Sequence, residues 1–180
     1  MYMMRVLSTI ATVAALTVLF GFTAQTVHAQ STSLTTEQID NIRSNCTSIK
    51  STLNQLHASD ALLRVNRGQV YESMASKLMD SFNSRLGNNR LDAKATSAVT
   101  SSYRTALDSF RNDYKAYEEK LSSAIRINCL NEPESFYNTI EQARENRAKV
   151  HDDVMKLHRY IDDYRSAVSD FLLNYERISE

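Results

Sequence analysis

Beyond residue 29 the chain contains two glycines, Gly68 and Gly87, and a single proline, Pro133. A β-sheet protein needs many tight turns, and these turns depend on glycine for positive φ angles and on proline for corners. The roughly 150 residues of this part have the size of one ordinary domain. Because they contain so few turn residues, they predict an all-α fold made of a few long helices.

The first predicted helix runs from about Thr36 to Leu86. Thr35 and Gln38 form a capping-box pattern, which marks a helix start. Apolar residues then recur at steps of three and four, the spacing of one helix face. Because this phase continues through the sequence HASD, one helix is favoured over a break near Ser59 with Asp60 as the next cap. The predicted stripe is Ile39, Ile42, Cys46, Ile49, Leu53, Leu56, Asp60, Leu63, Arg67, Val70, Met74, Leu78 and Phe82.

Two more helices follow the sequence RLGNNRLD, in which Gly87 is a candidate left-handed cap. Asn131 is the predicted cap of the last helix, with Pro133 in its first turn, where a missing N–H costs nothing. Three helices joined by short loops run up, down and up, so we expect an elongated bundle of three long helices, or four if the first is broken. The second stripe is Leu91, Ala95, Val99, Tyr103, Leu107, Phe110, Tyr114, Tyr117, Leu121 and Ile125. The third has the heptad pattern of a coiled-coil seam, with Phe136, Ile140, Ala143, Arg147, Val150, Val154, Leu157, Ile161, Tyr164, Val168, Phe171, Tyr175 and Ile178.

The chain has two cysteines, Cys46 and Cys129, and both fall in predicted apolar stripes. The helical rise places Cys46 about 15 Å above the start of the first helix and Cys129, on the descending helix, about 20 Å above the same base. The two heights agree within one helical turn, so we expect a disulfide that staples the hairpin. A reactive thiol at Cys129 is the alternative, and it would need a nearby base that the local sequence does not supply.

The same arithmetic places Arg67, Asp113 and Arg147 about 44 to 47 Å above the base. We expect a buried polar layer in which Asp113 bridges the two arginines, a device that mostly fixes helix register. The cluster could instead hold an anion between the helices. Arginines that extend to solvent would contradict the buried layer.

The last predicted helix extends about ten residues beyond the turn at GNNR if it is straight. Its apolar end would then lack cover within the chain and would suggest self-association or a docking surface. The alternative is a bent helix, or a polar turn folded over the end. The residues of this candidate docking end are Phe171, Leu172, Leu173, Tyr175 and Ile178.

Residues 1–29 contain one basic residue, Arg5, an apolar run, and small residues at Val27 and Ala29. This pattern is typical of a secretory signal peptide that is cut after Ala29. A retained membrane anchor is the alternative, because the run is long enough to span a bilayer of roughly 30 Å. Either outcome predicts an extracytoplasmic protein, secreted or in the cell envelope.

The remainder consists of a polar leader, residues 30–35, and one helical bundle domain, residues 36–180. Arg5 is the only charged residue among the first 29, so this part keeps 20 of the 21 basic and all 21 acidic residues, a formal charge of −1. Such a balance does not call for nucleic acid or anionic lipid as a partner. Membrane contact is expected only through an uncut N-terminal segment.

No catalytic motif is present in the sequence: there is no glycine-rich phosphate loop, no G-x-S-x-G and no H-E-x-x-H. His151 and His158 are seven residues apart, about 10 Å along a helix and too far to share one metal ion. We therefore expect no enzyme activity, no cofactor and no metal site.

Three segments, LRVNRGQVYESMASKLM, RINCLNEPESFY and RENRAKVHDD, resemble those of uncharacterised secreted coiled-coil proteins of bacteria of the Saccharibacteria type. The resemblance implies a bacterial envelope or secreted location and no activity. The sequence thus predicts a non-enzymatic envelope or secreted bundle with a structural or protein-interaction role. The alternative is an extracytoplasmic bundle that binds a small anion or organic ligand beside an arginine layer.

Overall fold

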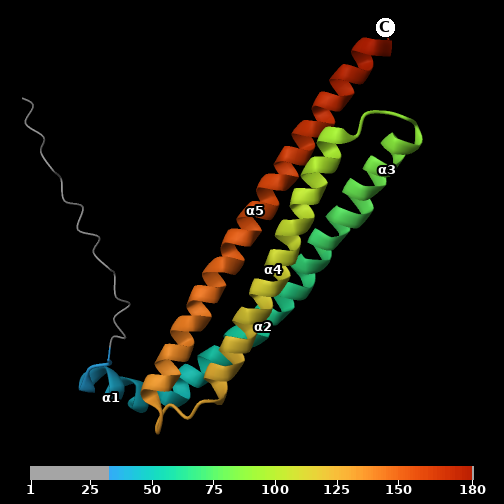
Figure 1. Ribbon diagram of the computed structural model, residues 1–180. Helices are drawn as coiled ribbons and strands as arrows, with labels where there is room; N and C mark the ends of the chain where they lie inside the picture. Colours follow the sequence, from blue (N-terminus) through green and yellow to red (C-terminus); the bar gives the residue numbers. More distant parts are fainter. Residues whose placement is uncertain (1–32, 180) are drawn as a thin grey trace, which may run out of the picture. The chain divides into compact units, whose positions relative to one another are not determined.

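The computed structural model describes residues 33–179, so the predicted signal peptide and the first residues of the polar leader lie outside the described part. Every regular element of residues 33–179 is helical. The elements are α1 (Thr36–Ser44), α2 (Cys46–Ser73), the π-helix η1 (Met74–Met79), α3 (Asp80–Asn88), α4 (Lys94–Arg126) and α5 (Pro133–Ser179). Helix α1 lies at the base, α2, η1 and α3 ascend one after another, α4 descends beside them and α5 ascends along α4 (Figure 1). The predicted all-α, up-down-up bundle is confirmed.

The start of the first long helix follows the predicted cap. The Thr35 hydroxyl accepts a hydrogen bond of 3.2 Å from the Gln38 main-chain N–H, and the Gln38 side chain accepts one of 2.8 Å from the Thr35 N–H. Asn45 interrupts the helix for one residue between α1 and α2. The alternative break near Ser59 is wrong, because α2 continues through that residue.

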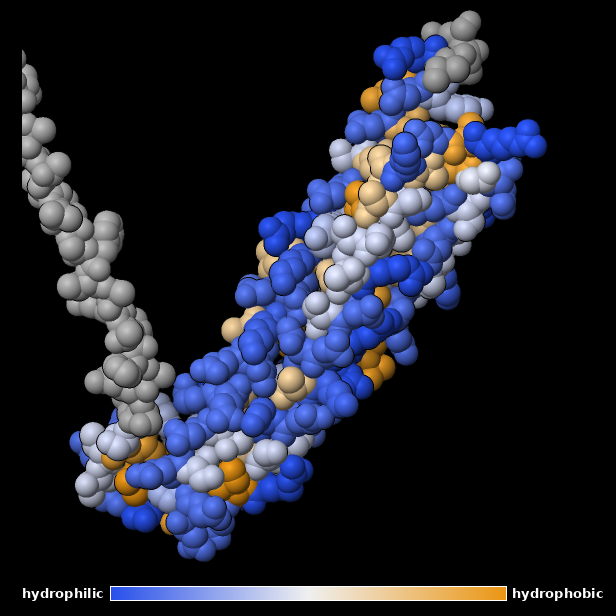
Figure 2. Space-filling model, in the orientation of Figure 1, coloured by the Kyte–Doolittle hydropathy of each residue, from blue (hydrophilic) through white to orange (hydrophobic). Residues whose placement is uncertain are grey.

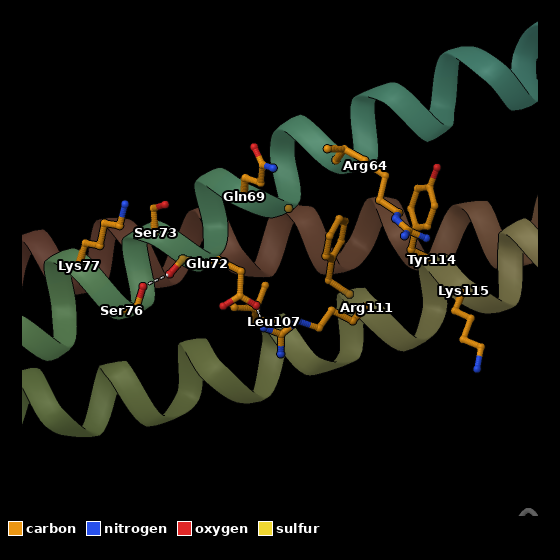
Figure 3. Close-up of a pocket in the computed structure, with 13 residues that line it drawn as sticks. Arg64, Gln69, Glu72, Ser73, Ser76, Lys77, Leu107, Arg111, Tyr114 and Lys115 are labelled. Carbon is orange, nitrogen blue, oxygen red and sulfur yellow. Dashed lines mark hydrogen bonds and ion pairs between the residues drawn. The ribbon is translucent and has the colours of Figure 1, made fainter.

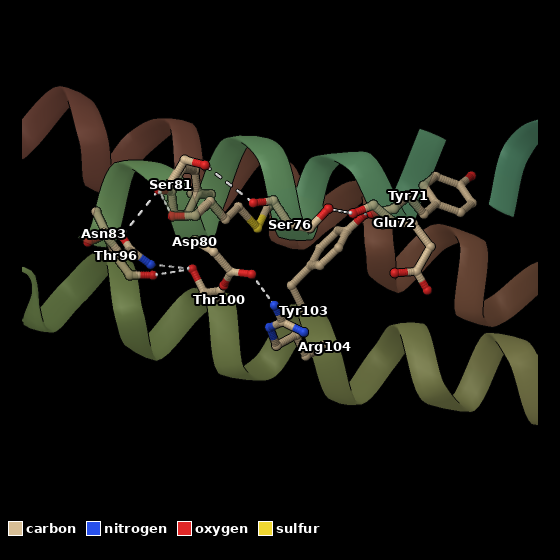
Figure 4. A network of polar contacts seen from close by, with 12 residues as sticks. Tyr71, Glu72, Ser76, Asp80, Ser81, Asn83, Thr96, Thr100, Tyr103 and Arg104 are labelled. Atoms are coloured by element: carbon tan, nitrogen blue, oxygen red, sulfur yellow. Dashed lines mark hydrogen bonds and ion pairs between the residues drawn. The ribbon is translucent and has the colours of Figure 1, made fainter. Parts of the chain in front are cut away.

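The register of the first stripe is wrong between residues 63 and 78. Leu63, Val70 and Leu78 are about half exposed, whereas Tyr71, Ala75 and Met79 are buried. The offset is already present at Tyr71, before η1 begins: the Tyr71 ring packs edge to face on Phe110 and is buried in place of Val70. The π-helix η1 follows within the same offset segment. Two tyrosine hydroxyls donate hydrogen bonds to main-chain carbonyls, one shortly before η1 and one at its end. Tyr103 on α4 donates to the Tyr71 carbonyl at 3.0 Å (Figure 4), and Tyr164 on α5 donates to the Met79 carbonyl at 3.2 Å.

The core follows the second and third predicted stripes closely. Burial of these two stripes against each other and against η1 is the main favourable contribution to folding. The buried residues that α4 contributes from its predicted stripe are Tyr103, Leu107, Phe110, Tyr114, Tyr117 and Leu121. The corresponding residues of α5 are Phe136, Ala143, Leu157 and Tyr164.

The two turns differ from their predicted caps. Arg90, with φ of 57°, takes the left-handed position after α3, and Gly87 does not. The Leu91 N–H bonds the Leu86 carbonyl at 2.9 Å and the Arg90 N–H bonds the Gly87 carbonyl at 3.0 Å, a Schellman motif. In the second turn Pro133 begins α5 as expected. Glu132, not Asn131, occupies the position before the helix, and its carbonyl accepts the Phe136 N–H at 3.0 Å. The Asn128 side chain accepts the Leu130 N–H at 3.0 Å within the preceding turn.

Candidate functional site: two grooves beside α2

Cys46 and Cys129 form the predicted disulfide, with their Cα atoms 5.7 Å apart and the two residues 83 positions apart in sequence. Both cysteines are buried and pack with Phe136 at the base of the bundle. The alternative of a reactive thiol at Cys129 is wrong, because no described cysteine is free. A disulfide fits an oxidising environment outside the cytoplasm.

Above the disulfide, the middle of α2 leaves two grooves, one on each side of it. The α2–α4 groove has a volume of about 820 Å³ and is lined by Arg64, Gly68, Glu72, Leu107 and Arg111 among others (Figure 3). Figure 3 shows Glu72 and Arg111 extending toward each other between the two helices, where they form an ion pair. The two charged groups that meet in the α2–α4 groove are therefore already paired with each other.

The α2–α5 groove has a volume of about 650 Å³ and shares Arg64, Phe110 and Tyr114 with the α2–α4 groove. Its floor is a row of aromatic rings from α4. The Phe110 and Tyr114 rings are tilted with centroids 6.2 Å apart, and the Tyr114 and Tyr117 rings meet edge to face at 5.9 Å. Leu63, Val150 and Val154 complete the apolar surface. A volume of this size is in the range of small-molecule sites.

Burial raises the pKa of two tyrosine hydroxyls of this floor. Burial, followed by the nearby carboxylates of Asp60 and Glu118, raises the pKa of Tyr114 to about 12. The Tyr117 hydroxyl donates a hydrogen bond of 2.6 Å to Asp60, and burial together with this bond raises its pKa further. Both phenols therefore remain protonated and neutral across physiological pH, and neither can serve as a base there.

The rim of the α2–α5 groove is rich in cations. Four arginines and one carboxylate line it, together with one histidine: Arg64, Arg67, Arg144, Arg147, Asp60 and His151. The guanidinium of Arg64 lies 5.2 Å from the centroid of the Tyr114 ring, a cation–π contact, and 2.7 Å from Glu118.

The buried polar layer of Arg67, Asp113 and Arg147 is wrong. Arg67 and Arg147 are both exposed, because their long side chains reach solvent at the groove rim. Arg147 lies 3.7 Å from Asp60 and not beside Asp113. The two arginines nevertheless line the same groove, as their equal heights suggested. Sequence reasoning missed Arg64 and Arg144, although R-x-x-R spacing in both helices was a usable signal.

Asp113 instead neighbours Asp153, a residue that the sequence analysis did not single out. Asp153 on α5 is 2% exposed, and its Oδ2 atom has no hydrogen-bond partner among the described residues. Its Oδ1 atom lies 3.1 Å from the Lys156 ammonium. Burial raises the pKa of Asp153, the pair with Lys156 opposes that rise, and the Asp113 carboxyl adds to it.

Ser122, His57 and Glu118 come together on the outer side of the bundle. The Ser122 hydroxyl lies 3.3 Å from His57 Nε2, and a Glu118 oxygen lies 4.0 Å from the same nitrogen. A serine–histidine–acid relay needs the serine and the acid on opposite ring nitrogens. Because both approach Nε2, this arrangement does not activate the serine as a nucleophile.

The candidate docking end is partly covered within the chain. Phe171 packs edge to face against Phe82 of α3, with ring centroids 6.0 Å apart, and stacks on Tyr175 at 6.0 Å. The expectation that Phe171 lacks such cover is therefore wrong. The exposed members are Leu172, Leu173 and Tyr175, and the side chain of Ile178 lies outside the described part. Figure 1 shows the end of α5 projecting beyond the turn between α3 and α4.

Within residues 33–179, no helix combines bilayer-spanning length with enough apolar character to cross a membrane. The same residues hold no group of three or more His, Cys, Asp or Glu side chains placed to bind a metal ion. In the comparisons with known proteins, no protein-family model, no curated protein and no solved structure matches the chain.

Proposed function

We propose that this protein is a non-catalytic, secreted or cell-envelope bundle whose role is to bind another protein through the outer face of α2. The disulfide, the signal-like N-terminal sequence and the resemblance to secreted bacterial coiled-coil proteins support the location. The partner would be a protein that presents an apolar helix face.

The observation that carries the proposal is the apolar surface of α2 and η1. A helix on the outside of a bundle normally directs charged and polar residues to solvent. Here the residues at least about half exposed include Leu62, Leu63, Val65, Val70 and Leu78, and Leu62 reaches 65%. Over its 28 residues, α2 buries only Cys46 and Tyr71. Much of the apolar content of α2 is thus available to a partner.

The surface around these residues has a hollow that can receive a side chain of a partner protein. Val70, Met74 and Leu78 line a shallow hollow together with Asn66, Gln69 and Ser73. On the face seen in Figure 2, hydrophobic residues form separate islands in a hydrophilic surface. Separate apolar anchors surrounded by polar residues are typical of transient protein interfaces and not of a permanent, fully apolar one.

Site-specific photocrosslinking in the native cells tests the proposal. A photoreactive residue at Leu62 or Val70 is expected to form one discrete adduct. The same residue at Glu145 or Arg159, on the exposed polar side of α5, is expected to form none. Adducts at all four positions, or at none, would contradict a binding face on α2. An adduct of twice the mass of the chain would identify a second copy as the partner.

A further inference from the structure

We infer that the α2–α5 groove is a binding site for a small organic anion, one that joins a carboxylate, sulfonate or phosphate group to a flat apolar body. This inference goes beyond the proposed protein partner and does not depend on it. It rests on the arginines of the rim and on the apolar lining of the groove.

Three of the four rim arginines have a carboxylate partner: Arg64 pairs with Glu118, Arg144 with Glu141 and Arg147 with Asp60. Arg67 makes no ion pair with a carboxylate of the described residues. Arg147 is 57% exposed and lies 3.7 Å from Asp60, whose side chain is 12% exposed, so its guanidinium remains largely open to solvent. Arg67 comes from α2 and Arg147 from α5, so the two guanidinium groups approach the groove from opposite sides. Guanidinium groups bind carboxylate, sulfonate and phosphate oxygens through paired hydrogen bonds.

The floor favours a flat apolar body. Phe110, Tyr114 and Tyr117 form a continuous row of rings whose hydroxyls, where present, are neutral. Each of these rings is at most 7% exposed, so the apolar lining open to a ligand includes Leu63, which is 48% exposed, beside the edges of the rings. An inorganic anion would leave this apolar lining uncovered, and an uncharged apolar ligand would leave Arg67 without a counter-ion. A molecule with both features satisfies the rim and the floor together, as small-ligand sites with a few oriented polar groups do.

The α2–α4 groove provides an internal comparison. It is of similar size, yet Glu72 and Arg111 form an ion pair across it and further carboxylate oxygens lie near its arginines. Arg111 is therefore already compensated, and Lys77 is the lining cation that makes no ion pair with a carboxylate of the described residues. We predict the preference for an anion for the α2–α5 groove, because arginines line it from both α2 and α5.

Two fluorescent probes separate the charge from the apolar body. Anilinonaphthalene sulfonate carries a sulfonate, and phenylnaphthylamine has the same rings without it. We expect saturable binding of the sulfonate to the oxidised protein, at least about tenfold tighter than the neutral probe. Added salt should weaken binding of the sulfonate probe and leave binding of the neutral probe unchanged.

Four variants locate the site. Arg67→Gln and Arg147→Gln should each lower the affinity for the sulfonate probe about tenfold and leave the affinity for the neutral probe unchanged. Ala148→Trp, which fills the α2–α5 groove, should abolish binding of both probes. Gly68→Trp fills only the α2–α4 groove, where a Cβ atom would have nothing within 4 Å, and should change neither. Arg159→Gln serves as the charge control.

Equal affinity for the two probes, or a sulfonate affinity unchanged in Arg67→Gln and Arg147→Gln, would overturn the inference. Loss of binding in Gly68→Trp but not in Ala148→Trp would place the site in the wrong groove. Because a loosened core also binds such dyes, each variant must keep the near-ultraviolet circular dichroism of the native protein. None of these outcomes bears on the α2 face that the crosslinking experiment tests.

Discussion

The hydroxyl of Tyr103 donates a hydrogen bond of 3.0 Å to the main-chain carbonyl of Tyr71. This bond joins α4 to the last turn of α2, immediately before the π-helix η1. The Tyr71 ring packs edge to face on Phe110, with centroids 5.5 Å apart. The π-helix, the buried side of α2 and the upper end of the aromatic floor are therefore held by one small group of residues.

Replacing Tyr103 by Phe is expected to destabilise the protein by about 1–2 kcal/mol, because a buried carbonyl loses its hydroxyl donor. Tyr103 is fully buried, so no water can take the place of the hydroxyl without a rearrangement. Urea denaturation followed by circular dichroism measures the change. Tyr160→Phe is the matched control, since Tyr160 makes no side-chain hydrogen bond to the described residues. An equal effect of the two substitutions would show that the bond to Tyr71 is not what Tyr103 contributes.

Arg90→Gly is expected to stabilise the protein by about 0.5–1 kcal/mol. Arg90 is held at φ of 57° by the Schellman motif, where a residue with a Cβ is strained by roughly 1–2 kcal/mol and glycine is not. The larger conformational freedom of glycine in the unfolded chain removes part of this gain. Thermal denaturation measures the difference. Arg90→Ala keeps the Cβ and should leave stability nearly unchanged, so a similar gain in both variants would assign the effect to the lost charge instead.

The long-range pairing of the helices could be predicted because helical rise is fixed. Counting residues brought Cys46 level with Cys129, and it also brought Arg67 and Arg147 to one groove. The side of the helix to which a given side chain points was harder to predict from the sequence. Tyr71 is buried in place of Val70 before the π-helix η1 begins, and the pattern of apolar residues does not show which of two neighbouring residues points inward.

The candidate groove was beyond sequence reasoning for a related reason. Its existence depends on how far α2 stands from α5, and this spacing depends on which residues of α2 turn inward. The stripe pattern selected Leu63 and Val70 as inward residues, but Tyr71 is the buried one. Asp153 was missed because it lies beside the seam residue Val154, and a period-seven pattern does not show that Asp153 is the more buried of the two.

The disulfide is expected to contribute about 4 kcal/mol, since it closes a loop of more than 80 residues in the unfolded chain. The double substitution of Cys46 and Cys129 by Ala should lower the free energy of unfolding by that amount and keep the helical content. Wild-type protein under reductant should behave in the same way. The native protein should resist thiol alkylation until reductant is added. Two thiols alkylated in the native protein would contradict the bond, and unchanged stability after reduction would contradict its energetic role.

Asp153→Asn is expected to stabilise the protein by about 1 kcal/mol at pH 7, because the charged carboxylate is buried with one oxygen unpaired. Its pKa in the folded protein is raised, so folding favours the protonated form. The stability that this form provides is fully present below the ordinary pKa of an aspartate, about 3.9, and is lost as pH rises through the raised folded value. The advantage of Asn should therefore be largest at neutral pH and shrink as the solution is acidified. The charged groups that face the site are Asp113 of α4 and Lys156 of α5.

Unfolding by urea at a series of pH values between about 3 and 8 gives the comparison. Asp152→Asn is the matched control, because Asp152 is exposed on the same helix. Its replacement should give the same dependence of the free energy of unfolding on pH as the wild type. Should Asp153→Asn instead lower stability at pH 7, the pair with Lys156 would outweigh the cost of burial. In that case the carboxylate would have to be ionised and favourable where it stands. A gain that stays constant at every pH would point to a packing effect of the amide and not to the charge.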